Sequence, residues 1–553
     1  MRAASGTVAE AVAAALARRG VGQAFGVVGS GNFHLTNALI ASGASYVAAR
    51  HEMGATVMAD AYARMSGTVG IASLHQGCGL TNAMTGLAEA AKSRTPLLVL
   101  AAEVTNPASN FYVDQPALAR AVGAESVRID DPARATDQAA AAYDLAAGER
   151  RTVLVNLPLD VQSAPAPQGC AYPARHEAPA TGSMPDPTDV AQLGRILAGA
   201  QRPVFIAGRG GRCARTEIEA AADSCGALLS TSAVAKGLFH GSPWSLDVSG
   251  GFATPLAANL IRGADVIVGF GCALNMWTTR HGRLIDREAT VVQIDLAADA
   301  LGRHHDIDLG VLGDSAEVAA ALVAELAGSS RSGYRSREIA VRIATEGRWR
   351  ALPYEDWAEG SGLDARIDPR TLTICLDDLL PAERVVSVDS GNFMGYPSMY
   401  LSVPDEYGFC FTQAFQSIGL GLATAIGAAL AQPDRLPVAA LGDGGAMMGI
   451  AELDTVRRLG QPMVVVVYND AAYGAEVHHF SAGEPLDTVT FPDTDVASIA
   501  SGYGFDAVTV RSVGDLAAVG RWLDGPRARP LLLDAKVANP RGAWWLEEAF
   551  RGH

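Results

Sequence analysis

Two aspartates follow predicted strands in positions from which they could share one ion. A β-branched strand ends at Leu441, and the glycine-rich turn after it carries Asp443. A predicted helix leads to a second strand, which ends just before Asn469 and Asp470. The carboxyl ends of neighbouring parallel strands form the edge at which open α/β sheets bind ligands. Because Mg²⁺ prefers oxygen ligands beside phosphate groups, this pattern predicts a diphosphate–Mg²⁺ site.

The glycines of this turn have two explanations. Gly442, Gly444 and Gly445 would let the backbone approach phosphate oxygens, and a helix predicted over 446–459 would offer free N–H donors at its start. A tight strand-to-helix turn with Asp443 as the N-cap explains the same residues without any ligand. The motif taken alone does not choose between them.

A glutamate near the start of the chain lies at a similar junction. Residues 46–50 form a predicted strand, and His51-Glu52 opens a predicted helix that continues through Ala63. Glu52 therefore sits at the turn between this strand and this helix. Helix dipoles favour a glutamate in the first turn, which explains the residue without a catalytic role.

Two more loops of this part of the chain follow predicted strands. His75 comes directly after the strand 69–74, where a lone histidine is ordinarily a hydrogen-bonded polar residue. The loop 29–34 contains three polar side chains, Ser30, Asn32 and His34.

The first motif resembles the fingerprint of thiamine diphosphate (ThDP) dependent enzymes. In that family GDG is followed by Asn-Asn or Asn-Asp, and here Asn469 and Asp470 come 26 and 27 residues after Asp443. The resemblance implies that Mg²⁺ is bound by the side chains of Asp443 and Asp470 and by the carbonyl of Ala472. The second residue of the pair is usually Asn, so Asp470 is a departure, and Asn469 is the alternative ligand. The cofactor-binding candidates of this segment are Gly442, Asp443, Gly444, Gly445 and Tyr473.

A second segment, RHEMGATVMADAYARMSG, resembles the pyrimidine-binding domain of acetolactate synthases and benzoylformate decarboxylases. The resemblance implies that Glu52 hydrogen-bonds N1′ of the aminopyrimidine. A proton shared there favours the 4′-imino form, whose nitrogen removes the proton from thiazolium C2.

Two further segments resemble cofactor-facing loops of this family. In Phe415-Gln-Ser-Ile-Gly-Leu-Gly421, the resemblance implies that Ile418 bends the cofactor and that the carbonyl of Gln416 accepts from its 4′-amino group. An ordinary core position is the alternative for Ile418. The loop Ser390-Gly391-Asn392, which follows the strand VVSVD, resembles the other diphosphate-facing loop.

Two residues favour one reaction type over another. His75 matches an active-site histidine of benzoylformate decarboxylase, whereas acetolactate synthases have no histidine there. Glu476 follows Asp470 by six positions, the offset at which pyruvate-decarboxylase-type enzymes carry a glutamate and acetolactate synthases an apolar residue. Both favour decarboxylation, with Glu476 as a proton donor and His75 as its partner. The alternative for Glu476 is a glutamate that opens the helix AEVHHF and faces solvent.

The order of predicted strands and helices that carry these residues indicates an α/β fold. Recurring β-branched runs, glycine turns and alanine-rich helical stretches are typical of domains with open parallel sheets. Strands are predicted at 24–28, 46–49, 69–74, 97–101 and 152–156, then at 203–207, 227–231, 265–270 and 290–294, and finally at 385–388, 437–441, 463–468 and 530–534.

The chain divides into three predicted domains. A pyrimidine-binding domain covers residues 1–165, a central domain 185–330, and a diphosphate-binding domain 365–553. A linker rich in Pro, Ala and Gly over 161–188 and a polar stretch over 327–364 separate them. The central domains of some relatives hold FAD or ADP. The turn GRGGR here is not the GxGxxG of a dinucleotide site, so FAD is not predicted.

Composition excludes several classes of partner. The chain has 553 residues, 49% of them hydrophobic, and a formal charge of −16 from 43 basic and 59 acidic side chains. This predicts a folded protein without a nucleic-acid or anionic-membrane surface. Seven scattered cysteines without a CxxC pair indicate neither a zinc site nor a disulfide framework, and no targeting signal or membrane span is visible. A cytoplasmic location is expected.

The main functional prediction is a ThDP- and Mg²⁺-dependent enzyme that decarboxylates a 2-oxo acid to an aldehyde without oxidation. Acyloin or acetolactate-type carboligation is the alternative, because it uses the same cofactor residues. A non-catalytic ThDP- or nucleotide-binding module would not need Glu52. The resemblance also implies a homodimer or homotetramer, in which the cofactor lies between two subunits. The substrate stays open, since its pocket would be formed by loops and by the stretch 542–548.

Overall fold

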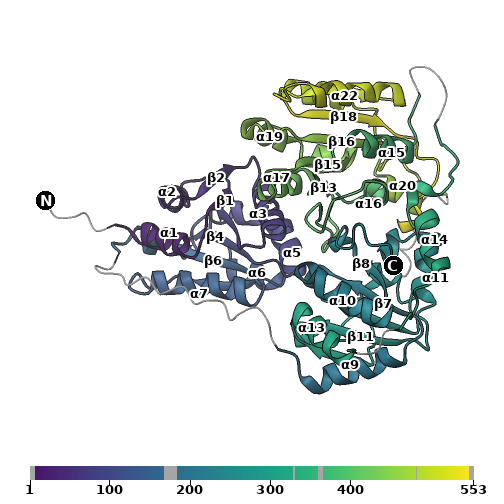
Figure 1. The fold of residues 1–553 in the computed structure, drawn as a ribbon. Helices are drawn as coiled ribbons and strands as arrows, with labels where there is room; N and C mark the ends of the chain where they lie inside the picture. Colours follow the sequence, from purple (N-terminus) through teal and green to yellow (C-terminus); the bar gives the residue numbers. More distant parts are fainter. Residues whose placement is uncertain (1–5, 167–183, 328–330, 359–364, 481–482, 547–553) are drawn as a thin grey trace.

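The computed structural model describes residues 6–166, 184–327, 331–358, 365–480 and 483–546. Within these ranges the chain forms three parallel sheets of six strands each, with helices interspersed (Figure 1). The predicted three-domain α/β fold with open parallel sheets is therefore confirmed. The N-terminal sheet contains β1 Gln23–Gly26, β2 Ser45–Ala48, β3 Gly70–Leu74, β4 Leu97–Glu103, β5 Glu125–Arg128 and β6 Thr152–Pro158.

The N-terminal and C-terminal sheets have the same topology. The first has the order β2-β1-β3-β4-β6-β5, and the last has the corresponding order β14-β13-β15-β16-β18-β17. The C-terminal sheet contains β13 Arg384–Val388, β14 Phe409–Phe411, β15 Leu436–Gly442, β16 Val464–Asn469, β17 Asp506–Val510 and β18 Leu531–Lys536. The central sheet, in the order β12-β11-β10-β7-β8-β9, contains β7 Pro203–Ala207, β8 Leu228–Thr231, β9 Ser245–Val248, β10 Val266–Phe270, β11 Thr290–Asp295 and β12 Leu309–Leu312.

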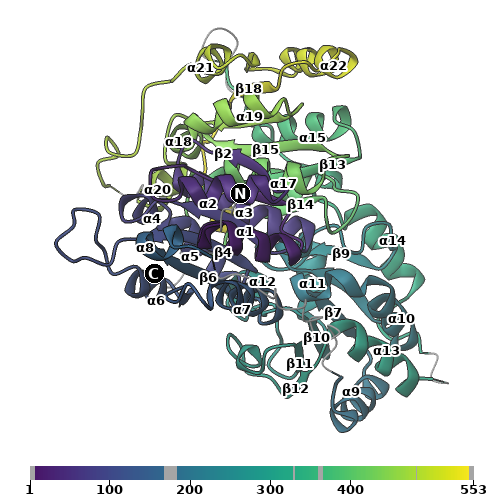
Figure 2. The same ribbon diagram turned by 90° about the vertical axis from the view of Figure 1, so that its left-hand side faces the viewer.

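Equivalent helices of the two similar domains pack against each other. Helix α3 (Glu52–Ser66) precedes β3, and α17 (Gly421–Ala431) precedes β15. The two helices lie side by side in both views (Figure 1; Figure 2). Gly427 allows this close approach, because a Cβ there would lie 2.2 Å from the carbonyl oxygen of Met58. One hydrophobic core therefore runs through both domains, from Phe25 to Leu532.

The strands that the sequence did not predict lie at sheet edges. β5, β9, β12, β14 and β17 each occupy one end of their sheet. Edge strands are half-exposed or short, so they lack the continuous apolar run of a central strand. β5, for example, has no fully buried residue, and β14 has only three residues.

Two other predictions needed correction. The helix predicted over 446–459 begins earlier, as α18 (Asp443–Met448), and is interrupted at Gly449 before η7 (Ile450–Glu452) and α19 (Leu453–Leu459). The polar stretch 327–364 contains the helix α14 (Arg337–Glu346), which buries Ile343 against the central domain. Most of the predicted linker, residues 167–183, lies outside the described residues. The exact domain bounds stay a prediction.

The described part of the chain contains six of the seven cysteines. Its six cysteines, Cys78, Cys213, Cys225, Cys272, Cys375 and Cys410, are all free. Among the described helices, none combines the length and apolar character that crossing a bilayer requires.

Candidate active site

Two carboxyl groups meet at the carboxyl edge of the C-terminal sheet. Asp443 is the first residue of α18 and follows β15 directly, and Asp470 lies in the loop after the neighbouring strand β16. Their side chains are within hydrogen-bonding contact. Burial and the adjacent Asp470 carboxylate raise the pKa of Asp443, and burial also raises the pKa of Asp470. Two like charges in a buried position favour a cation between them.

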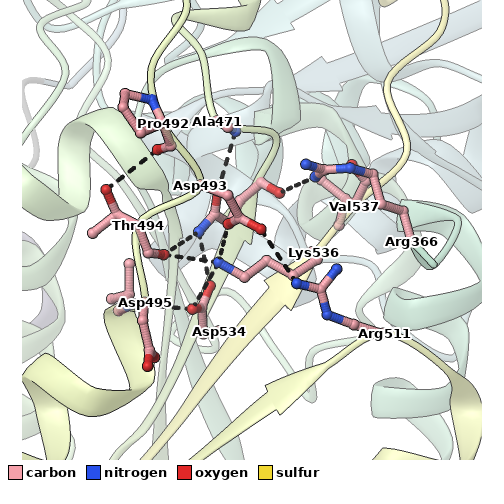
Figure 3. Close-up of polar contacts among 12 residues, drawn as sticks. Arg366, Ala471, Pro492, Asp493, Thr494, Asp495, Arg511, Asp534, Lys536 and Val537 are labelled. Atoms are coloured by element: carbon pink, nitrogen blue, oxygen red, sulfur yellow. Dashed lines mark hydrogen bonds and ion pairs between the residues drawn. The ribbon is translucent and has the colours of Figure 1, made fainter. Parts of the chain in front are cut away.

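Both polar atoms of the Asn469 side chain are used in hydrogen bonds within the protein. Its Nδ2 donates to Asp534 Oδ1 at 2.9 Å, its Oδ1 accepts from the N–H of Ala471 at 3.1 Å, and the residue is 1% exposed. Asp534 belongs to a buried ion-pair network with Lys536, which also contacts Asp493 (Figure 3). The alternative register, with Asn469 as a metal ligand, is therefore disfavoured.

The loop after Asp470 turns back through strained backbone. Ala471 has a φ of 58°, in the left-handed region that non-glycine residues rarely adopt. Ala472 pairs with Thr490 in an isolated antiparallel bridge whose hydrogen bonds use Ala471 and Tyr473. The hydrogen bonds of this bridge do not use the carbonyl of Ala472. Hard oxygen donors of this kind suit Mg²⁺.

The glycines of the GDGG turn are required by protein neighbours. A Cβ on Gly444 would lie 2.5 Å from the Tyr473 ring, and one on Gly445 would lie 2.3 Å from Asp389 Oδ2. The packing thus supports a tight turn, but Asp443 as its N-cap was wrong: Gly442 is the N-cap of α18, which has no side-chain capping hydrogen bond, and Asp443 is the first helical residue. Tyr473 is also placed at this turn, with its ring 4.9 Å from that of Phe491.

A chain of amide hydrogen bonds supports Asp470. Asn539 Nδ2 donates to Asp470 Oδ2 at 2.6 Å, and Asn392 Nδ2 donates to Asn539 Oδ1 at 2.9 Å. The main-chain N–H of Ala543 donates to Asn392 Oδ1 at 3.3 Å. The loop Ser390–Asn392 and the C-terminal segment therefore both reach the aspartate pair. Residues 547 and 548 of that segment lie outside the described part.

The loop before α17 carries Gln416 and Ile418 toward the same edge. Ile418 is half-buried and belongs to none of the hydrophobic core clusters, so the ordinary core position is disfavoured. The next residue, Gly419, approaches Met448 of α18 so closely that a Cβ would lie 2.9 Å from Met448 Cβ. Burial raises the pKa of Asp389, which binds this loop, to about 6, although backbone N–H donors lower it.

A second group of side chains lies in the N-terminal domain. Glu52 is the first residue of α3, and Asn82 Nδ2 of α4 (Cys78–Asn82) donates to Glu52 Oε2 at 3.1 Å. A Cβ on Gly79 would lie 3.4 Å from Glu52 Oε1 and 2.9 Å from His75 Cβ. Glu52 and His75 therefore border the same glycine. Both are half-buried, so solvent or a ligand can reach them.

The surroundings of His75 indicate its tautomer. Its Nδ1 lies 2.8 Å from the carbonyl oxygen of Gln76, which can only accept, so Nδ1 carries a proton. Nε2 is left for other partners, and Ser30 Oγ lies 3.5 Å away. The ring of Phe111 packs edge-on at 5.5 Å.

The other two residues of the first loop do not lie beside His75. Asn32 is fully buried and fixes the loop by hydrogen bonds with Gly29, Val27 and Ser73. His34 is exposed on α2 (Phe33–Ala41). Ser30 is therefore the loop residue nearest the Glu52 group.

Glu476 lies on the short helix α20 (Gly474–His479) close to the aspartate pair. A Cβ on Gly474, two residues earlier, would lie 2.3 Å from Asp470 Oδ2. Glu476 is half-buried, and within the described ranges its carboxylate makes no hydrogen bond or ion pair. Within one chain, no described hydrogen bond or ion pair joins the Glu52 group to the aspartate pair.

Three site residues were not predicted from the sequence. Asp389 directly follows the strand β13, so the rule that polar residues at strand ends form sites could have found it. A repeat was also visible, since Ser-Gly-Asn-Phe occurs at 30–33 and at 390–393, after equivalent strands of the two similar sheets. Asn82 and Asn539 carry no local signal, because their partners are distant in the sequence.

Comparisons with protein families agree with this geometry. Residues 6–121 match the model of the thiamine pyrophosphate enzyme N-terminal TPP binding domain, 190–322 the central domain, and 389–534 the C-terminal TPP binding domain. Together the three matches cover more than half of the chain. The chain belongs to the thiamine pyrophosphate enzymes. The predicted resemblance is thereby confirmed, since thiamine pyrophosphate and ThDP are the same compound.

Curated relatives of this thiamine pyrophosphate enzyme have several activities in their names. A probable sulfoacetaldehyde acetyltransferase of Rhizobium meliloti is 27% identical, covering 91% of this chain and 89% of the relative. A probable 2-ketoarginine decarboxylase of Pseudomonas aeruginosa is 29% identical, with 90% and 88% covered. A probable acetolactate synthase large subunit of Methanocaldococcus jannaschii is 25% identical, with 92% and 88% covered. These names support the prediction that the chain is an enzyme. They do not determine whether it catalyses decarboxylation or carboligation.

The Asn539 contact gives a prediction about cation binding. Asn539→Ala removes the donor to Asp470 Oδ2, and loss of such an outer-shell partner typically weakens a metal site by about 10- to 100-fold. We expect the Mg²⁺ concentration that half-saturates ThDP binding, followed by tryptophan fluorescence, to rise in that range. Asn259→Ala, at an exposed position on α11 (Pro255–Arg262), serves as the control. An unchanged Mg²⁺ requirement in Asn539→Ala would show that Asp470 does not depend on this bond.

Proposed function

We propose that this enzyme uses ThDP and Mg²⁺ to decarboxylate a small 2-oxo acid to the corresponding aldehyde. The reaction breaks the bond between the carboxylate and the carbonyl carbon, releases CO₂ and delivers one proton to that carbon. The observation that carries the proposal is that His75 and Glu52 both border Gly79, His75 with its Cβ and Glu52 with its carboxylate. An imidazole is the side chain best suited to moving a proton near neutral pH.

Bound ThDP would supply the electron sink that makes loss of CO₂ possible. Glu52 would hold a proton at N1′ of the aminopyrimidine, and the Asn82 contact to Oε2 keeps its carboxylate in one orientation with Oε1 left for the cofactor. Asp443, Asp470 and the Ala472 carbonyl would hold Mg²⁺ against the diphosphate. The charge of the cation would relieve the repulsion within the buried aspartate pair.

Other residues would fix the position of the cofactor. The half-exposed Ile418 side chain would support its bend, and the carbonyl of the exposed Gln416 would accept from the 4′-amino group. Gly442, Gly444 and Gly445 would leave room for the diphosphate beside Tyr473. Ser390, Gly391 and Asn392 would line the opposite side of the diphosphate. Glu476 would donate the proton that releases the aldehyde, because its carboxylate is not engaged elsewhere among the described residues.

A second subunit would complete each site. The Glu52 group and the aspartate pair belong to different domains, and no described hydrogen bond or ion pair joins them within one chain. Exposed apolar side chains lie close to both, with Phe111 against His75 and Met447 and Met448 on α18. Exposed apolar side chains around two half-sites suit burial by another copy. We therefore propose a homodimer as the minimum, with a tetramer as the alternative.

Carboligation is the second candidate function. It is supported by relatives whose names include acetyltransferase and acetolactate synthase. The purified enzyme should be incubated with ThDP, Mg²⁺ and a panel of 2-oxo acids while CO₂, aldehyde and acyloin are followed together. Aldehyde as the main product supports decarboxylation, and acyloin or 2-hydroxy-2-oxo acid products support carboligation.

Glu52→Gln should fold and bind ThDP but lose turnover by about 10²- to 10⁴-fold, the usual contribution of a general acid–base group. The amide cannot exchange the proton that a carboxyl group shares with N1′. CO₂ release under ThDP saturation measures the effect. Glu217→Gln is a matched control, because Glu217 is also half-buried in the first turn of a helix, α10 (Arg215–Cys225). Turnover near the wild-type value in Glu52→Gln would mean that another residue activates the cofactor.

Asp443→Ala should abolish Mg²⁺-dependent ThDP binding. The diphosphate would then meet the Asp470 carboxylate without a bridging cation. Asp470→Asn should have a mild effect, because it keeps an oxygen ligand and restores the residue usual in the family. Isothermal titration with ThDP at saturating Mg²⁺ measures both. Complete loss of binding in Asp470→Asn would show that the assigned register of the metal ligands is wrong.

Glu476→Gln should slow aldehyde release more than CO₂ release. Without the carboxyl proton, added acceptor aldehydes should divert the reaction into acyloin. The product ratio is measured by chromatography after single turnovers, with and without acceptor. If aldehyde release and the product ratio both stay at wild-type values, Glu476 is not the proton donor and carboligation is favoured.

A further inference from the structure

The loop that carries Gln416 and Ile418 is held at its start by a carboxylate from another domain. Glu89 of α5 (Met84–Lys92) accepts from the N–H of Ala414 at 3.0 Å with Oε1 and from the N–H of Phe415 at 2.6 Å with Oε2. Glu89 is completely buried. Hydrogen bonds to an ionised acceptor are about twice as strong as neutral ones. The N-terminal domain thus fixes the first two residues of a loop in the C-terminal domain.

A second buried carboxylate holds the end of the same loop. Asp389 accepts from the N–H of Gly419 at 3.0 Å and from the N–H of Leu420 at 3.2 Å, and it is 1% exposed. Gly421 leaves room for Asp389, because a Cβ at position 421 would lie 2.5 Å from Asp389 Cβ. Both ends of the loop 414–420 are therefore tied by paired backbone N–H bonds to one carboxylate each.

The backbone between these two anchors is strained. Gln416 has a φ of 63° and Gly419 a φ of 87°, both in the left-handed region. A non-glycine residue holds this conformation only when its surroundings impose it. Gln416 is itself exposed, so its side chain does not impose the conformation. The two carboxylate anchors flank this residue, with Glu89 bound just before it and Asp389 just after it.

Glu89 is also bound by a buried arginine. Arg64 of α3 forms an ion pair with Glu89 at 2.8 Å and another with Asp60 at 2.8 Å. Arg64 also donates to the carbonyl oxygen of Phe411 at 3.2 Å, just before the loop. Asp60 shares the arginine with Glu89 but does not contact the loop, which makes it a natural control.

We propose that Glu89 and Asp389 are positioning residues that clamp the loop 414–420, so that Ile418 and the carbonyl of Gln416 are in place before the cofactor binds. This rests on the proposed function for the roles of Ile418 and Gln416. The clamp itself is a property of the chain without cofactor. It links the cofactor-facing loop of the C-terminal domain to the N-terminal domain of the same chain.

The test uses the full-length protein and three isosteric variants, Glu89→Gln, Asp389→Asn and the control Asp60→Asn. An amide side chain accepts fewer of these N–H bonds and places its own NH₂ against the donors. Backbone hydrogen exchange of residues 414–420 is measured without ThDP, and the ThDP concentration for half-saturation is measured at saturating Mg²⁺. Ile418→Ala is added alone and together with Glu89→Gln.

We expect Glu89→Gln and Asp389→Asn to raise both exchange of the loop amides and the half-saturating ThDP concentration by about 10-fold or more. Asp60→Asn should change neither. The effects of Glu89→Gln and Ile418→Ala on ThDP binding should be non-additive if the clamp acts through Ile418. If Glu89→Gln does not fold, Asp389→Asn makes the same test from the other end of the loop.

Two results would overturn the clamp: unchanged loop exchange in Glu89→Gln and Asp389→Asn, or equal effects of Asp60→Asn and Glu89→Gln. Additive effects of Glu89→Gln and Ile418→Ala would also contradict it, because they would indicate a general structural role. Failure of the wild-type protein to bind ThDP would instead contradict the proposed function. The exchange measurement without cofactor keeps the two failures apart.

Discussion

The packing of α3 against α17 is the contact on which the positions of the site residues depend. It joins two domains of equal topology through one hydrophobic core, so neither domain can move without the other. At the start of α3 the backbone N–H groups of Arg50 and His51 donate to Glu452 Oε1, at 3.0 and 3.1 Å. Beyond α3, Glu89 reaches the loop 414–420. Glu52 and the aspartate pair lie in different domains, and no described hydrogen bond or ion pair joins them within one chain. The proposed homodimer would supply each site with Glu52 from one chain and the aspartate pair from the other.

Buried carboxylates are the second common feature of the site. Glu89, Asp389 and Glu452 each accept at least two backbone N–H bonds, which compensate for their burial. Asp443 and Asp470 differ, because they face each other and burial raises the pKa of both. Among these five carboxylates of the described chain, this pair is the one whose members repel each other. A dication held between them would offset that repulsion and would also attract the phosphates of the cofactor, which gives a physical reason for cation and cofactor to bind together.

The sequence predicted the parts of this arrangement that local pattern determines. Central strands such as β15 and β16 are continuous apolar runs, and their order along the chain places Asp443 and Asp470 at one edge. Edge strands such as β5 were missed because half-exposed residues carry no such run. The helix after Asp443 was predicted as continuous, since nothing local shows that Gly449 interrupts it. Asn539, Glu89 and Asn82 could not be predicted, because each acts on a residue distant in the sequence, and only the fold brings them together.

Mixing two inactive variants tests most directly whether each site is built from two chains. Purified Glu52→Gln and Asp443→Ala proteins are dissociated, combined in equal amounts and reassociated, and CO₂ release from a 2-oxo acid substrate is compared with that of each variant alone. In a hybrid dimer with sites shared between chains, one site receives both defects and the other receives an intact Glu52 and an intact Asp443. The account predicts that the mixture regains up to about a quarter of wild-type activity, since half of the dimers are hybrids with one intact site. No recovery, with hybrid dimers shown to form, would mean that Glu52 and Asp443 act within the same chain.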